Sequence, residues 1–168
     1  MQQHFDIVAD LDTPVSAYLK LKPLMPRYLL ESVEGGKHVG RYSFLGFGKT
    51  REFRLDANGA RMNGHSLPAA RDPEAFLDVF RQALAAAPKL YPEIPELPFD
   101  GGLVGVSAYD LIRNFESLPV GGPASRWPRA LYLATDSLLV FDHLTRRAAL
   151  LHSGNEIERS RLRRQVLD

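Results

Sequence analysis

The sequence predicts an α+β fold that consists mainly of antiparallel sheets with two to four helices. Most apolar segments are short, and turns such as Asn58-Gly59, a dipeptide typical of tight hairpins, separate them. The longest apolar run, residues 130–141, is followed by a polar turn and by a second strand-like segment at 147–152. Strands that follow one another through hairpins, rather than alternating with helices, favour antiparallel sheet over a doubly wound parallel fold.

The length and composition predict one compact domain, residues 1–168. The chain is 45% hydrophobic and 24% charged, as is ordinary for a globular protein. Its net charge of +1 gives no electrostatic reason to expect nucleic acid or a membrane as a partner. The absence of cysteine excludes disulfides, thiolate metal ligands and cysteine nucleophiles. The sequence has neither a leader-like start nor a run of about 18 apolar residues, so we expect a cytoplasmic protein.

Strand-like and helix-like segments follow one another along the whole chain. The expected strands are residues 5–9, 28–33, 41–47, 51–56, 61–63, 101–108 (a buried one), 130–141 and 147–152. A hydroxyl or carboxyl cap followed by proline predicts helices that start at Thr13-Pro14 and Asp72-Pro73. The second helix carries an apolar stripe that we expect to face the core: Phe76, Leu77, Phe80 and Leu84. Helices are also expected at 109–116 and 156–168, and the proline-rich segment 88–98 is expected to be extended.

The chain shows no catalytic constellation of its own. The segment Gly46 to Thr50 ends like a phosphate-binding loop, but Ser43 stands where the first glycine is required, and the residues that follow read as a strand. The five histidines have no metal-ligand spacing, and no serine has an evident base partner. We therefore expect no catalytic residue, no metal site and no cofactor within these residues.

A carboxylate and a hydroxyl interrupt one of the expected strands, in the segment Leu29-Leu30-Glu31-Ser32-Val33. Adjacent residues of a strand point to opposite faces, so one of Glu31 and Ser32 is expected to point inward. A buried polar side chain needs a partner, and Arg41 on the expected return strand is a candidate. The pattern is open to two interpretations: an ion pair within a hairpin, or a small pocket that holds a charged ligand.

Two blocks of the sequence resemble a known family. The first comprises DTPVSAYLKL at 12–21, LLESVEGG at 29–36 and GRYSFLG at 40–46. The second comprises GGLVG at 101–105, with Tyr109-Asp110 and RNFE at 113–116. In this order they are similar to the amino-terminal signature of anthranilate synthase component I, a chorismate-utilising enzyme family. Val106 stands where the family has tyrosine and Ile112 where it has valine, which are changes in packing.

The resemblance implies an amino-terminal, regulatory region of an enzyme that converts chorismate and ammonia or glutamine to anthranilate and pyruvate. It implies that this region binds tryptophan, the feedback inhibitor, through Ser32 directly, with Leu30 and Glu31 beside it and Arg41 at a basic position of the pocket. The family's chorismate- and Mg²⁺-binding residues belong to its carboxy-terminal region. We therefore expect that this region is absent here and that the 168-residue chain alone is inactive.

The partners that the resemblance implies are L-tryptophan, the remainder of component I and the glutamine amidotransferase component II. We also expect self-association, because a face that meets the remainder of component I would be apolar and exposed. Three alternatives stay open on the sequence alone. They are the equivalent region of aminodeoxychorismate synthase component I, a free-standing amino-acid-binding module, and a structural fragment in which Glu31 is paired with Arg41.

Overall fold

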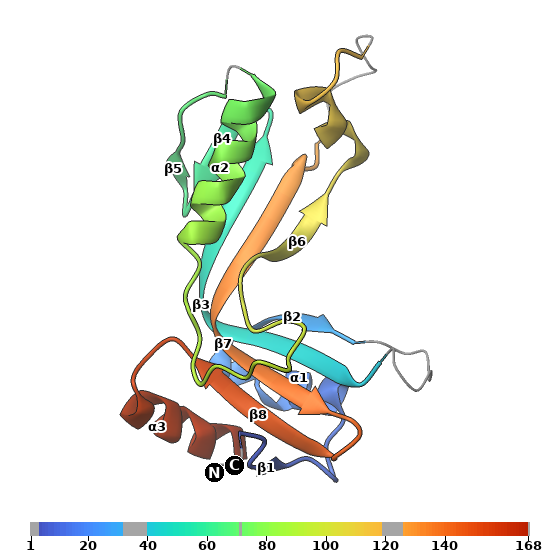
Figure 1. Cartoon of the computed structure of the whole chain (residues 1–168), viewed down its shortest axis with the longest axis vertical. Coiled ribbons are helices and arrows are strands. Elements are labelled where there is room, and N and C mark those ends of the chain that lie inside the picture. The colour runs from blue at the N-terminus through green and yellow to red at the C-terminus, as the bar shows by residue number, and fades with distance from the viewer. Residues whose placement is uncertain (1–3, 32–39, 71, 119–125, 168) are drawn as a thin grey trace. The chain divides into compact units, whose positions relative to one another are not determined.

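The computed structural model describes residues 4–31, 40–70, 72–118 and 126–167. Its described residues gather into two compact units. The first unit is drawn from Met1–Thr50, Pro88–Gly101 and Thr135–Asp168, and the second from Arg51–Ala87 and Gly102–Ala134. Two long strands, β3 (Tyr42–Asp56) and β7 (Ala130–Asp142), contribute residues to both units (Figure 1).

The first unit contains an antiparallel sheet. Its strand order is β1 (Ile7–Val8), β8 (Arg147–His152), β7 and β3, and β2 (Pro26–Leu30) also pairs with β3. The β7–β8 hairpin is in register from Ser137 opposite His152 to Asp142 opposite Arg147. Hairpin pairing was expected for both β7–β8 and β2–β3, and the structure confirms both.

Alternate residues of these strands are buried on opposite faces of the sheet. On β7, Leu139 and Phe141 belong to one core cluster, whereas Leu138 and Val140 belong to another. The first cluster is covered by apolar residues of α1 (Pro14–Lys20) and α3 (Glu156–Leu167). The second is covered by the proline-rich segment, through Leu90, Ile94, Leu97 and Phe99. Burial on both faces explains why residues 138–141 are all apolar rather than alternating with polar ones.

The helices of the first unit begin at side-chain caps, and the cap at Thr13 is the one expected from the sequence. Thr13 Oγ1 accepts a hydrogen bond from the Ser16 backbone N–H, and Ser16 Oγ accepts one from the Thr13 backbone N–H, so the two residues form a capping box before α1. Asn155 and Glu158 form the same reciprocal pair at the start of α3. A 3₁₀ helix, Lys22–Leu24, follows α1.

The second unit packs helix α2 (Pro73–Ala85) against strands. Its strands are β4 (Gly59–Met62), β5 (His65–Ser66), β6 (Val104–Ser107) and the parts of β3 and β7 that belong to it, and a 3₁₀ helix covers Tyr109–Asn114. Asp72 caps α2 as expected. The expected core stripe is partly wrong: Phe76 is buried, but Leu77 and Leu84 are 37% and 55% exposed, and Val79 and Ala83 are buried instead. The buried face is therefore centred on positions 76, 79 and 83, which also lie at helical spacing.

The structure confirms the α+β class with antiparallel strands, three α-helices and two 3₁₀ helices among the described residues. One expected boundary in β3 and one expected burial in β6 are wrong. Segments 41–47 and 51–56 form one continuous strand. Gly48 lies between them with a φ of +85°, and a side chain at this position would be strained and would clash with its neighbours, so glycine allows the strand to continue. The segment around β6 is not buried: β6 pairs with β7, and Val106 is 69% exposed.

Candidate functional site

Three of the residues predicted to bind a ligand are described, and they lie at one end of the β2–β3 hairpin: Leu30, Glu31 and Arg41. Leu30 is the last residue of β2, opposite Phe44 of β3, and it is 40% exposed. Glu31 follows directly, outside the strand, and its side chain is exposed. The expected continuation of the strand through Glu31 is wrong, so Glu31 does not point inward. Ser32 lies outside the described residues, as does the segment 34–37, for which the paired glycines Gly35-Gly36 predict a turn.

Arg41 pairs with Asp142, not with Glu31. Its Nε donates to Asp142 Oδ1 at 3.0 Å and its Nη2 donates to Asp142 Oδ2 at 2.8 Å, a bidentate arrangement. Asp142 is 2% exposed and Arg41 is 45% exposed, so the pair reaches from the interior to the surface. The guanidinium carbon also lies 4.8 Å from the centre of the Tyr42 ring. Arg41 is thus held at the start of β3 by a carboxylate that is distant in sequence.

Two further hydrogen bonds join His143 to the residues around the start of β3. The His143 backbone N–H donates to the Arg41 carbonyl at 2.9 Å, and His143 Nε2 lies 2.8 Å from the hydroxyl of Ser43, which is fully buried. We call Arg41, Ser43, Asp142 and His143 the β3 clasp. The clasp joins the turn after β7 to the first residues of β3. It therefore fixes the first residues of β3, where Phe44 pairs with Leu30 at the end of β2.

The electrostatics of the clasp keep Asp142 ionised. Burial pushes the pKa of the Asp142 carboxyl upward, but hydrogen bonds from Arg41 and from the Leu144 backbone N–H, with the charge of Arg41, outweigh it. The net result is a lowered pKa for Asp142 and a raised pKa for Arg41. The clasp is therefore charged on both sides at neutral pH.

We expect the clasp to make the first unit sensitive to acid. Because the native pKa of Asp142 is lowered, its stabilising contribution is present above the ordinary carboxyl value of 3.8 and is lost as the pH falls below it. Asp142→Asn should lower the thermal midpoint at neutral pH by about 2–4 °C and flatten its decline in acid. Asp78→Asn, in the exposed Asp78–Arg81 pair, is the matched control and should change little. Identical acid profiles for Asp142→Asn and the wild-type chain would contradict this role.

An aromatic row adjoins Leu30 on its face of the sheet. Phe44, the cross-strand partner of Leu30, contacts Tyr42 and Phe99, with ring centres 6.2 and 5.4 Å apart, and Tyr42 contacts Phe5. Next to this row, the Tyr28 ring lies across Gly46, and its hydroxyl is 3.3 Å from Thr135 Oγ1. Burial raises the pKa of the Tyr28 hydroxyl. The partly exposed Leu30 thus lies opposite a member of an aromatic core cluster, and the exposed Glu31 follows it in the chain.

The sequence interpretation missed Asp142, Ser43 and His143 as members of this site. The available signal was an aspartate at the end of the longest apolar run, where a strand passes into a turn. Among the described residues, no three His, Cys, Asp or Glu side chains are placed to hold a metal ion together. None of the helices in the described ranges is both long and apolar enough to cross a membrane.

Comparison with known proteins identifies the relatives of the chain. It is 39% identical to anthranilate synthase component 1 of Thermus thermophilus, over 93% of this chain and 33% of that protein. It is 38% identical to the Pseudomonas aeruginosa protein of the same name, over 83% of this chain and 29% of that protein. For the Synechocystis protein of that name the identity is 40%, over 83% and 28%. No protein-family model matches the chain.

A solved structure shows the same fold. The crystal structure of anthranilate synthase component I from Streptococcus pneumoniae aligns with 96% of this chain and 35% of its own, at a TM-score of 0.57 and 24% identity. The chain is thus related to anthranilate synthase component I through most of its length. It spans about a third of the length of the curated relatives it matches.

Proposed function

We propose that the chain is the amino-terminal, tryptophan-binding region of an anthranilate synthase component I. The whole enzyme would convert chorismate with ammonia or glutamine to anthranilate and pyruvate in tryptophan biosynthesis. The observation that carries the proposal is identity of 38–40% to proteins of that name, over at least 83% of this chain. The same relatives favour the anthranilate enzyme over the aminodeoxychorismate enzyme, since each of the three is named for anthranilate.

The end of the β2–β3 hairpin is the proposed tryptophan site. Its supporting features are the exposed Glu31, the half-exposed Leu30 and the aromatic row beside it. We assign the indole to the surface formed by Leu30, the ammonium to Glu31 and a direct polar contact to Ser32. Asp142 engages Nε and Nη2 of Arg41, and we assign the remaining Nη1 to the ligand carboxylate. An amphiphilic ligand is suited to such a border between apolar and charged surface.

The same proposal supplies the partners and the setting. The whole enzyme would be cytoplasmic, would bind Mg²⁺ and chorismate in its carboxy-terminal region, and would receive ammonia from a glutamine amidotransferase component II. Tryptophan would inhibit it by binding its inactive arrangement more tightly than its active one. The remainder of component I would cover the region of β6, where two large side chains are exposed. They are Val106 on β6 and Tyr109, which follows the strand and is 87% exposed.

The isolated chain should form no anthranilate. We assign no catalytic role to any of the described residues, and the relatives are about three times as long as the chain. The test is the appearance of anthranilate fluorescence after addition of chorismate, Mg²⁺ and ammonia, with the whole Thermus thermophilus relative as the positive control. Anthranilate formation above the level of a buffer blank would contradict the proposal that the catalytic residues lie outside this chain.

A further inference from the structure

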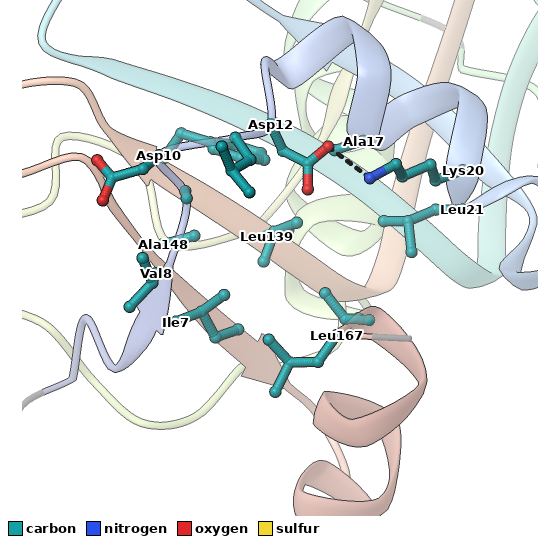
Figure 2. Close-up of a pocket in the computed structure, with 14 residues that line it drawn as sticks. Ile7, Val8, Asp10, Asp12, Ala17, Lys20, Leu21, Leu139, Ala148 and Leu167 are labelled. Carbon is teal, nitrogen blue, oxygen red and sulfur yellow. Dashed lines mark ion pairs between the residues drawn. The ribbon is translucent and has the colours of Figure 1, made fainter.

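A cavity of about 300 Å³ lies in the first unit, and its lining does not include Leu30, Glu31 or Arg41 (Figure 2). Strand β1, helix α1, the sheet face formed by β7 and β8, and the end of α3 supply its lining. Figure 2 shows Ile7, Leu21, Leu139 and Leu167 around one common space. Ile7, Leu21 and Leu139 are all at least 95% buried, so the floor of the cavity is part of the apolar core.

The polar side of the cavity carries both signs of charge. Lys20 Nζ lies 2.8 Å from Asp12 Oδ1, and the side chains are 69% and 35% exposed. Ser16 Oγ donates to the same carboxylate oxygen at 3.0 Å. In Figure 2, Asp12 and Lys20 point toward one another at the rim, whereas the carboxylate of Asp10 points away from them. The hydrogen bond from Lys20 is the main reason why the pKa of Asp12 is lowered, so the pair is ionised at neutral pH.

We propose that this cavity binds an α-amino acid with an apolar side chain. The ammonium of the ligand would bind Asp12, its carboxylate would bind Lys20, and its side chain would fill the apolar floor. The ligand would replace the direct contact between Asp12 and Lys20. A ligand with one charge would then pair with only one of these side chains and leave the other without a partner, whereas a zwitterion would pair with both. A cavity of this volume is at the small end of ligand sites, which suits a single amino acid.

The lining also predicts selectivity among amino acids. Its polar side chains are Asp10, Asp12 and Lys20, and all of them belong to the β1–α1 region, away from the floor. The phenol hydroxyl of tyrosine or the indole N–H of tryptophan would therefore meet only apolar side chains there, and burial of an unpaired polar group is costly. Phenylalanine, leucine and methionine are the expected ligands. None of Leu30, Glu31 and Arg41 lines the cavity, so this site is separate from the proposed tryptophan site.

The test is a titration of the 168-residue chain with L-phenylalanine, followed by amide shifts in ¹H–¹⁵N NMR spectra. We expect saturable shifts at Ala17, Lys20 and Leu21. Phenethylamine, which lacks the carboxylate, and 3-phenylpropionate, which lacks the ammonium, should each bind about tenfold more weakly. Lys20→Met should weaken phenylalanine binding by a similar factor. The matched control Lys22→Met, an exposed lysine outside the cavity, should leave it unchanged.

A second variant tests the cavity itself. Ala17→Leu places a larger apolar side chain in the cavity, so it should abolish binding while the spectrum and the thermal midpoint remain those of a folded chain. Phenylalanine that does not bind at millimolar concentration, or that binds equally to Lys20→Met or Ala17→Leu, would overturn the proposal. Ser32→Leu should leave phenylalanine binding intact. A failure of the cavity proposal can therefore be distinguished from a failure of the proposed tryptophan site.

Discussion

In a whole enzyme that contains this sequence, Ser32→Leu should weaken inhibition by tryptophan about 5- to 150-fold, with turnover largely unchanged. This range corresponds to a coupling free energy of about 1–3 kcal/mol between an inhibitor site and a distant catalytic site. Leucine removes the hydroxyl that the proposal assigns to the inhibitor and introduces a larger, apolar side chain. The measurement is the tryptophan concentration that halves the rate of anthranilate formation at a fixed chorismate concentration.

The matched control for that prediction is Ser66→Leu. Ser66 is an exposed serine on β5, in the second unit, and it is not assigned to any ligand. This variant should keep the wild-type sensitivity to tryptophan. If Ser32→Leu also retained that sensitivity, Ser32 would be removed from the inhibitor site, although the family relationship of the chain would stand.

Gly46→Ala should destabilise the chain by about 2–3 kcal/mol, although Gly46 does not have a positive φ. Gly46 is the cross-strand partner of Tyr28, and a Cβ atom added to it would overlap the Tyr28 ring. The ring is held by core packing and by its contact with Thr135, so it cannot swing away without loss of both. Urea unfolding, followed by circular dichroism, measures the effect.

The control is the same substitution in a Tyr28→Ala background. With the ring absent, Gly46→Ala should cost less than about 0.5 kcal/mol, because the two changes concern one contact and are not additive. An equal cost in both backgrounds would show that something other than the Tyr28 ring excludes a side chain at position 46.

Local rules account for the parts of the fold that the sequence predicts well. The capping box at Thr13 and the cap at Asp72 depend on neighbouring residues, so they can be identified from short patterns. The β7–β8 hairpin follows from a long apolar run, a polar turn and a second apolar run. The Asn58-Gly59 turn likewise sets the pairing of Asp56 with Gly59.

Long-range contacts account for the features that were missed. Arg41 and Asp142 are 101 positions apart, and no periodicity or spacing connects them. The buried face of α2 depends on which strands lie beside it, so Leu77 fits a helical stripe and is still exposed. Segments 41–47 and 51–56 form one strand because Gly48 adopts a φ of +85°, a conformation that an isolated glycine in a sequence does not reveal.

The most direct test of the central claim is a chimaera in which this chain replaces the corresponding third of the Thermus thermophilus relative. We expect an enzyme that forms anthranilate from chorismate and that tryptophan inhibits, with inhibition weakened by Ser32→Leu. A folded chimaera that forms anthranilate but does not respond to tryptophan, in a parent enzyme that does, would contradict the assignment of this chain as the tryptophan-binding region.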